Sequence, residues 1–504
     1  MPLPLVNSVA AWFLKKRIHQ IELFLKYPNE VQNELLTDLL NEAKDTELGI
    51  KYDFKSIKNY NDFADRLPII NYEDYHGLIQ RSLKGEQNIF WPKPIKWFAK
   101  SSGTTNSKSK FIPVSSDSLE NCHYAAGKDL LCIYFNNNPE SGLFNGKNLR
   151  LGGSKELYEE NGSVFGDLSA ILIDNMPFWA EFSSTPSNKI SLMSEWESKM
   201  KAIVQETKSE NVTSLAGVPS WMLVLLNNVL ETTDQKNILD LWPNLEVYFH
   251  GGVSFKPYEA EYKKIIPSNN FNYYETYNAS EGFFAIQDRN SSDELMLMLD
   301  YGIFYEFISM ETFGSKNQKI IPLEKVEKGK NYAIVITTNA GLWRYLIGDT
   351  VRFTSTSPYR IKISGRTKHF INVFGEELII ENTDKAIQIA TKKSNCEIRD
   401  YTVAPIFMKG KQKGAHEWLI EFKRPPKNIQ YFSELLDNAL KSLNSDYEAK
   451  RLNNITLDMP KINMANQGVF HNWLKHKNRL GGQHKIPRLS NSRLLIEALL
   501  KLNQ

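Results

Sequence analysis

Cysteine is scarce in this sequence, with only Cys122, Cys132 and Cys396 among 504 residues. An odd number of cysteines without a C-x-x-C pair argues against a disulfide framework and against a cysteine zinc site. The nine histidines contain no H-x-x-x-H pair, and His471 and His476 are too far apart to share a helical face. We therefore expect buried thiols, a cytoplasmic protein and no metal site built from side chains alone.

The chain also lacks an excess of charge and a long apolar run. Lysine and arginine total 61 against 58 acidic residues, which disfavours nucleic acid or an anionic membrane as the main partner. The longest apolar run, 295–308, is interrupted by Asp300 and Glu306 and predicts two buried strands around Tyr301-Gly302. The apolar start of the chain precedes the basic residues 15–17, the reverse of a secretory signal, and is too short to cross a bilayer. We expect it to form an amphipathic helix and predict no membrane partner.

Neither a P-loop motif nor a strand-linked G-x-G-x-x-G occurs, so the common nucleotide-binding signatures are missing. Instead, the segment SSGTTNSKSKFIP at 101–113 reads as a turn between strands. Small hydroxyl residues and a glycine let backbone and side-chain donors close around phosphate oxygens, and a lysine adds positive charge. The alternative is a solvated loop rich in serine and threonine. The residues concerned are Ser101, Ser102, Gly103, Thr104, Thr105 and Lys110.

The length of the chain predicts more than one lobe. A helical lead-in over 1–66 precedes short β-rich runs that alternate with helical stretches, which indicates α/β layers with a mixed sheet. At Ser364-Gly365-Arg366 the chain leaves a strand and enters a segment typical of a small α+β lobe. We therefore expect an N-terminal domain over 1–365 and a C-terminal domain over 366–504.

Two further motifs carry groups suited to a nucleotide. The strand LEVYFHGG ends in Gly251-Gly252, which is either a tight turn or bare backbone for a flat ligand. The aromatic strand in NYYETYNASEG leads to Tyr277, Ser280 and Glu281. An aromatic ring, a hydroxyl and a carboxylate suit a base, a phosphate and Mg²⁺, although a core strand that ends in a capped turn has the same pattern.

A third element, GLWRYLIGDTVRF, places Asp349 after Gly348 in an expected turn between two apolar runs. A carboxylate fixed there can accept hydrogen bonds from both hydroxyls of a ribose, whereas the commonplace alternative is a hairpin turn. Each motif is weak by itself. Their occurrence in one order along one chain is the strong observation.

In that order, SSGTT, YNASE, RYLIGD and SGRTKHFINVFGEEL resemble the adenylate-forming superfamily of acyl-CoA synthetases, luciferases and nonribosomal adenylation domains. The forms SSGTT and YNASE, with the closing LNSDYEAKR and LGGQHKIPRL, resemble the auxin-responsive acyl-acid amido synthetases, the Gretchen Hagen family. The resemblance extends from about Pro68 to the C-terminus. It implies a large luciferase-like lobe with a mixed sheet, which binds ATP and the acyl substrate, and a smaller mobile α+β lobe that acts as a lid.

The resemblance also implies residue roles. Residues 101–105 and Lys110 would bind phosphates, Gly251 and Gly252 would lie beside adenine, and Asp349 would bind ribose. Tyr277, Ser280 and Glu281 would bind the nucleotide, with Glu281 holding Mg²⁺. Arg366 would act with Lys368 at the interdomain hinge next to the nucleotide, and Lys485 would approach the substrate carboxylate, so that Lys485, Glu281 and Lys110 are the expected catalytic residues. In one departure, Ser107 replaces a second glycine and would change how the loop sits on the phosphates.

The implied reaction is adenylation of a carboxylic acid by ATP with Mg²⁺, followed by transfer of the acyl group to the amine of an amino acid. We expect a monomer. Two rival functions share the fold: an acyl-CoA synthetase, and a silent acid- or nucleotide-binding homologue for which Ser107 is the only hint. The helix after Gly217-Val218-Pro219, with Trp221 and Met222, is the expected source of the acyl pocket, although either residue would also suit a core. Nothing in the sequence identifies the acid or the amino acid.

Overall fold

The computed structural model describes most of the chain, with the backbone alone at 101, 178–179, 196 and 220–221. The chain forms two units: residues 1–347 with 352–362, and residues 348–351 with 363–504. The described residues are 17–101, 110–152, 157–160, 162–176, 178–193, 195–252, 255, 258–367, 371, 378, 380–406, 414–444, 447–448, 451, 457–477, 486–490 and 492–503.

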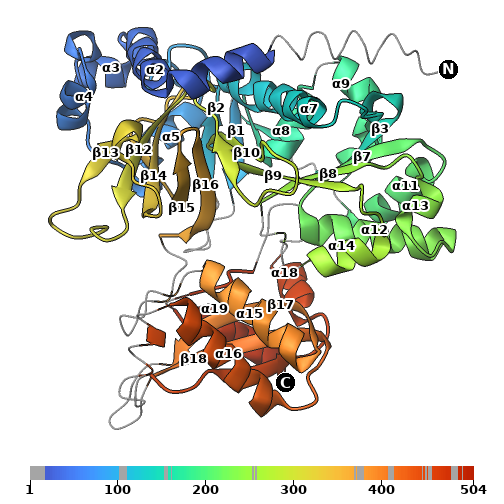
Figure 1. Cartoon of the computed structure of the whole chain (residues 1–504). Helices are drawn as coiled ribbons and strands as arrows, with labels where there is room; N and C mark the ends of the chain where they lie inside the picture. The colour runs from blue at the N-terminus through green and yellow to red at the C-terminus, as the bar shows by residue number, and fades with distance from the viewer. Residues whose placement is uncertain are drawn as a thin grey trace. The chain divides into compact units, whose positions relative to one another are not determined.

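Among these residues, twelve strands form one mixed sheet (Figure 1). Neighbours in the run from β9 through β8, β7 and β3 to β6 are parallel, whereas β9–β10, β10–β11, β11–β16, β12–β13 and β12–β14 are antiparallel. The strands are, in spatial order, β13 (Ile320–Pro322), β12 (Ile303–Ser309), β14 (Asn331–Thr338), β15 (Tyr345–Thr356), β16 (Tyr359–Arg366), β11 (Leu295–Leu297), β10 (Gly282–Ile286), β9 (Asn272–Ala279), β8 (Val247–Gly251), β7 (Val212–Gly217), β3 (Lys147–Leu151) and β6 (Ser184–Thr185).

A smaller four-stranded sheet in the first unit carries the serine- and threonine-rich motif. Its order is β2 (Lys110–Val114), β1 (Trp97–Ser101), β5 (Ser163–Gly166) and β4 (Tyr158–Glu160). Helices surround both sheets, beginning with a helix through residues 17–26. The others are α2 (Pro28–Ala43), α3 (Glu47–Lys51), α4 (Tyr60–Arg66), α5 (Tyr72–Leu83), α6 (Ser116–Ser118), a π-helical segment (Leu119–Tyr124), α7 (Ala125–Asn137), α8 (Leu168–Asp174), α9 (Phe178–Phe182), α10 (Asn188–Ser191), α11 (Trp196–Thr207), α12 (Pro219–Thr233), α13 (Ile238–Leu241) and α14 (Glu259–Ile265).

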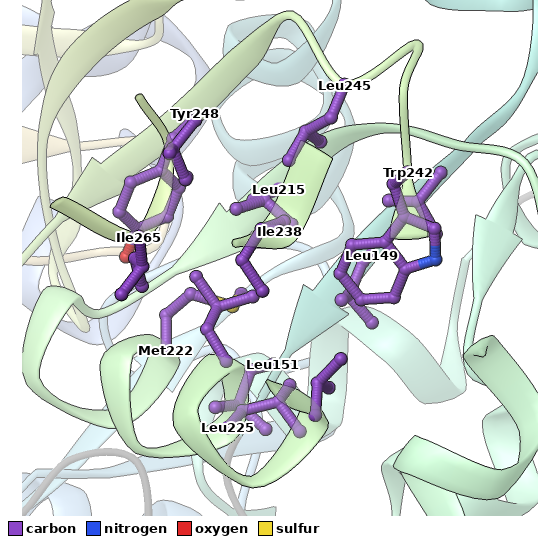
Figure 2. Close-up of a cluster of buried hydrophobic side chains, with 14 of the residues drawn as sticks. Leu149, Leu151, Leu215, Met222, Leu225, Ile238, Trp242, Leu245, Tyr248 and Ile265 are labelled. Atoms are coloured by element: carbon purple, nitrogen blue, oxygen red, sulfur yellow. The ribbon is translucent and has the colours of Figure 1, made fainter. Parts of the chain in front are cut away.

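One face of the parallel strands is covered by α11, α12, α13 and α14, which lie below β7 and β8 in Figure 1. Leu149, Leu215 and Tyr248 point to this face and pack against the helices around them (Figure 2). Successive side chains of a strand alternate between the two faces of a sheet, so the intervening Arg150 and Phe249 point to the other face. Phe249 accordingly packs edge-on against Tyr134 of α7.

The second unit contains a three-stranded sheet, β17 (Glu397–Ile406), β18 (Ala415–Arg424) and β19 (Lys461–Ala465). One face packs against α15 (Ile380–Ser394) and α16 (Ile429–Leu443), and the other against α18 (Val469–His476) and α19 (Leu494–Leu502). Within β18, Trp418 and Ile420 face α15 and α16, whereas Leu419 faces α18 and α19. The strand is therefore buried on both faces, which explains its three consecutive apolar residues Trp418, Leu419 and Ile420.

Several predictions from sequence are confirmed. The fold is α/β with a large mixed sheet and a separate C-terminal α+β unit. The run 295–308 forms β11 and β12 around Gly302, and the three cysteines are buried free thiols. Apart from these confirmed predictions, no helix in the described part of the chain is both long and apolar enough to cross a membrane.

The predicted turn at Asp349 is wrong. Asp349 lies inside strand β15, which continues from Tyr345 to Thr356. Gly348 has a φ of 92°, which only glycine adopts readily, so the Gly-Asp pair produces a local irregularity within the strand rather than a chain reversal. Thr367 donates its backbone N–H to the Gly348 carbonyl at 2.7 Å, which fixes this irregularity.

Candidate active site

The predicted phosphate loop connects two paired strands. Ser101, the last residue of β1, lies opposite Lys110, the first residue of β2. The Lys110 ammonium lies 5.3 Å from the centre of the Tyr72 ring, and the Tyr72 hydroxyl accepts a hydrogen bond from the Phe111 backbone N–H at 2.9 Å. A cation over an aromatic face is stabilised by the ring quadrupole. The structure therefore holds a lysine at one end of the loop. The intervening predicted residues Ser102, Gly103, Thr104 and Thr105, and also Ser107, lie outside the described residues.

Gly251 ends the buried strand β8 and Gly252 follows it, as predicted. Gly251 pairs with Thr276 of β9, and a Cβ atom at position 251 would lie 2.6 Å from the Thr276 carbonyl oxygen. Gly252 has a φ of 80°. Both positions consequently require glycine, one because of close backbone approach and the other because of its left-handed conformation. Bare backbone therefore follows the end of β8.

Tyr277, Ser280 and Glu281 lie at the β9–β10 hairpin. Ala279 pairs with Gly282, so Ser280 and Glu281 form the connecting two-residue turn. Ser280 is buried and Glu281 is half-buried. The hairpin places a hydroxyl and a carboxylate side by side at its tip.

The Tyr277 ring is 4 % exposed and packs 4.8 Å from Phe284. Its neighbour Asn278 is exposed, and the Asn278 amide oxygen lies 3.4 Å from where a Gly251 Cβ would be. Because Gly251 pairs with the residue before Tyr277, the glycine pair and the hairpin motif lie at one corner of the sheet. The structure brings together these two motifs, which are 26 residues apart in the chain.

Asp349 and Arg366 form an ion pair within the second unit. The Arg366 Nε lies 2.7 Å from the Asp349 Oδ1 atom. The Asp349 carboxylate is buried, whereas the Arg366 side chain is half-exposed. The guanidinium contact stabilises the buried carboxylate, and carboxylate oxygens can accept hydrogen bonds from a sugar hydroxyl. Two residues assigned to ribose and hinge from the sequence are thus direct neighbours.

His250 immediately precedes the glycine pair and is a neutral buried residue. Its ring stacks on Phe255 with centroids 4.3 Å apart, and burial lowers the pKa of His250 to about 3. No hydrogen-bond partner of its Nδ1 atom occurs among the described residues. His250 therefore contributes no positive charge at the end of β8 at neutral pH.

The side chains of Ser280 and Glu281 suit Mg²⁺ that is bound together with a nucleotide. They do not suit a metal ion held by the protein alone. The described residues contain no cluster of three or more histidine, cysteine or acidic side chains able to hold a metal ion. Mg²⁺ commonly uses one or two protein carboxylates and completes its shell with phosphate oxygens and water. The half-buried carboxylate of Glu281, on a turn beside the Ser280 hydroxyl, fits that arrangement.

Lys368 and Lys485 lie outside the described residues, as does the Trp221 side chain. Met222 is fully buried in the cluster beneath β7 (Figure 2), so it packs as a core residue. Tyr72 is a contact that the sequence does not reveal, because 38 residues separate it from Lys110 and no local motif links them.

Three GH3 domains match the chain in order. The GH3 family N-terminal domain matches residues 17–271, the central domain residues 296–366 and the C-terminal domain residues 381–494. Indole-3-acetic acid-amido synthetase GH3.4 of Arabidopsis thaliana is 21% identical over 94% of this chain and 91% of its own. Jasmonoyl–L-amino acid synthetase JAR6 of Nicotiana attenuata is 23% identical over 95% of each chain.

Solved structures have the same fold. AtGH3.15 acyl acid amido synthetase, in complex with 2,4-DB, superposes with a TM-score of 0.81 and 17% identity over 97% of this chain and 96% of its own. 2-Hydroxyisobutyryl-CoA ligase in its postadenylation state superposes with a TM-score of 0.57 and 13% identity, over 99% of this chain and 92% of its own. The resemblance predicted from the motifs is thus confirmed: the chain belongs to the GH3 family and has the fold of the adenylate-forming enzymes.

Proposed function

We propose that this protein is an acyl-acid amido synthetase, a ligase that activates a carboxylic acid with ATP and joins it to an amino acid. The observation that carries the proposal is the corner formed by Gly251-Gly252 and the Tyr277–Glu281 hairpin, in a chain that GH3 domains match along most of its length. The curated relatives are named for indole-3-acetic acid and for jasmonoyl-amino acid synthesis. Neither acid is assigned to this chain.

In the first half-reaction, a carboxylate oxygen of the acid attacks the α-phosphorus of ATP. The bond from that phosphorus to the bridging oxygen breaks, and pyrophosphate leaves. Two anions must approach each other, so cations are needed to offset their repulsion. We assign this role to Lys110, which is fixed over Tyr72, and to Lys485. Mg²⁺ bound with the nucleotide would neutralise phosphate charge, and Glu281 is the residue we propose to hold it.

In the second half-reaction, the amine of the amino acid attacks the carbonyl carbon of the acyl adenylate. The bond from that carbon to the phosphate oxygen breaks, AMP leaves with the oxygen, and the amine loses a proton as the amide forms. The protein mainly positions the reactants. The bare backbone at Gly251 and Gly252 would hold the adenine, and Asp349 would hold the ribose hydroxyls.

The second candidate is an acyl-CoA synthetase, because a CoA ligase has the same fold. The GH3 structure superposes more closely, with a TM-score of 0.81 against 0.57, which favours the amido synthetase. The two functions share the first half-reaction and differ in the acceptor. We also infer that the protein is a monomer. We infer a cytoplasmic location, because free thiols stay reduced in that compartment.

The test is exchange of labelled pyrophosphate into ATP over a panel of carboxylic acids, followed by product analysis with amino acids or CoA. We expect exchange that depends on one class of acid, and an amide product together with AMP when an amino acid is added. A thioester product with CoA and no amide would establish the acyl-CoA synthetase instead. Absence of exchange and of product with every acid would identify a silent homologue.

A further inference from the structure

Arg150 is a buried guanidinium with no anionic partner among the described residues. Its side chain is 8 % exposed, and no hydrogen-bond partner of its Nε atom occurs among the described residues. Its Nη1 atom lies against the Met176 sulfur, a weak acceptor, and its Nη2 atom donates to the neutral amide oxygen of Asn188. Both of these partners are neutral, and no ion pair of Arg150 occurs among the described residues. Burial of an unpaired charge is strongly unfavourable, so its presence requires an explanation.

The other arginines that the structure describes as buried are paired. Arg344 binds the Glu306 carboxylate with two hydrogen bonds, and Arg451 does the same with Asp437. Burial lowers the pKa of Arg150, and the carboxylate of Glu181, which lies farther away, opposes this shift only in part. The described residues therefore leave the positive charge of Arg150 largely uncompensated.

Arg150 lies at the end of the sheet where a ligand of an open α/β sheet binds. It is the penultimate residue of β3, and it lies in register with Ala216 of β7, which pairs in turn with Phe249 of β8. Because these strands are parallel, their carboxyl ends share one edge. Gly251, the last residue of β8, and Gly252 after it lie at that same edge.

A second buried cation occupies the same edge. The Lys199 Nζ atom on α11 donates to the carbonyl oxygen of Gly152, the residue that follows β3, at 3.1 Å. Burial lowers the pKa of Lys199 to about 8, and Asp167 partly opposes that shift. Two buried basic side chains, Arg150 and Lys199, thus lie at the end of β3.

The proposed reaction brings two kinds of carboxylate to the enzyme. The carboxylate of the acid is consumed, because it becomes a mixed anhydride with AMP. The α-carboxylate of the acceptor amino acid stays ionised from binding to product release. A fixed guanidinium that remains charged suits the α-carboxylate, because that group stays ionised throughout the reaction. The N–H donors of a guanidinium also match the geometry of a carboxylate.

We propose that Arg150 binds the α-carboxylate of the acceptor amino acid and so selects amino acids over simple amines. This inference rests on the proposed function. Arg150 could instead bind a second carboxylate on the acid that is activated. The experiment distinguishes this carboxylate from the α-carboxylate of the amino acid.

The experiment compares wild type with Arg150→Gln and Arg150→Lys, using the acid found by pyrophosphate exchange. The acceptors are the amino acid that wild type prefers and its α-carboxamide, which lacks the negative charge. Arg360→Gln is the matched control, because Arg360 is also part-buried in the first unit but is paired with Asp288 at 2.6 Å. Thermal unfolding of each variant is measured alongside, since Arg150→Gln removes an unpaired buried charge and should leave the melting temperature unchanged or raised.

We expect Arg150→Gln to raise KM for the amino acid by about 10- to 100-fold, the range for a hydrogen bond to a charged group. In Arg150→Gln, KM for the acid in pyrophosphate exchange should change less than about 2-fold. Arg150→Lys should raise KM for the amino acid less than Arg150→Gln does, because it retains the charge. With wild type, KM for the carboxamide should exceed KM for the amino acid by about the factor by which Arg150→Gln raises KM for the amino acid. Arg150→Gln itself should have similar KM values for the two acceptors. Arg360→Gln should alter neither KM.

An unchanged KM for the amino acid in Arg150→Gln overturns the inference. A raised KM for the acid alone also overturns it and assigns Arg150 to a diacid substrate. If Arg150→Gln lowers the melting temperature as much as Arg360→Gln does and leaves both KM values unchanged, Arg150 is a structural residue. If wild type itself forms no amide with any amino acid, the proposed function has failed, an outcome distinct from these.

Discussion

Arg344 and Glu306 form a buried ion pair with two hydrogen bonds, Nε to Oε2 at 2.9 Å and Nη2 to Oε1 at 2.8 Å. Their side chains are 3 % and 1 % exposed. The remaining Arg344 nitrogen, Nη1, donates to the backbone carbonyls of Ala64 and Leu67. The pair therefore connects the end of helix α4 to strand β12, and so joins the N-terminal helices to the large sheet.

We predict that Arg344→Met lowers the free energy of unfolding by about 3–5 kcal/mol, because it leaves Glu306 as an uncompensated buried charge. Urea unfolding followed by circular dichroism measures the change. The control is Arg81→Gln, which removes an exposed ion pair with Glu47 and should cost far less. Equal losses in the two variants would show that the buried pair has no special role.

A second prediction concerns two glycines with opposite surroundings. Gly251→Ala places a Cβ atom 2.6 Å from the Thr276 carbonyl oxygen, so we expect a loss of about 1–3 kcal/mol and weaker ATP binding. Gly127→Ala lies on helix α7 with nothing within 4 Å of the new atom, so we expect a gain of up to about 1 kcal/mol and unchanged ATP binding. Chemical denaturation and equilibrium binding of ATP measure both effects. A neutral Gly251→Ala would contradict the close approach of β8 and β9.

The order of helices and strands could be predicted because periodicity and glycine positions are local signals. The aromatic strand β9 and the strand that ends at Gly251 follow from their sequences alone, whereas the return strand β10 was not predicted. Asp349 shows the limit, since a Gly-Asp pair marks either a hairpin turn or an irregularity inside a strand, and only the pairing of β15 decides between them. The contacts of Lys110 with Tyr72 and of Arg344 with Glu306 join distant segments and carry no local signal.

The pH dependence of stability provides a third prediction. Burial lowers the pKa of His250 to about 3, below the unfolded value of about 6.5. As the pH falls through this interval, the unfolded chain binds a proton that the folded protein does not, so His250 makes stability fall with pH. We expect the slope of unfolding free energy against pH between about 3.5 and 6 to be up to about 1.4 kcal/mol per pH unit smaller in His250→Leu. Urea titrations across this range measure it, and parallel curves for the two proteins would contradict the neutral buried histidine.

Lys485 provides a fourth prediction, which separates the two half-reactions. The proposed role of Lys485 is confined to adenylation, where it offsets the repulsion between the carboxylate and ATP. Lys485→Ala should therefore lose pyrophosphate exchange by a far larger factor than it loses amide formation from a supplied acyl adenylate. Lys477→Ala, a change to another lysine of the C-terminal unit, is the matched control and should retain both activities. Equal losses of the two activities in Lys485→Ala would contradict the assigned role.

The most direct test of the central claim, activation of an acid as its mixed anhydride with AMP, follows the oxygen atoms of the acid. The acid is labelled with ¹⁸O in its carboxylate, and the products of amide formation are analysed by mass spectrometry. The proposed chemistry breaks the bond between the carbonyl carbon and the bridging oxygen, so each AMP should contain one labelled oxygen and pyrophosphate should contain none. Label in inorganic phosphate or pyrophosphate, with unlabelled AMP, would contradict the formation of an acyl adenylate.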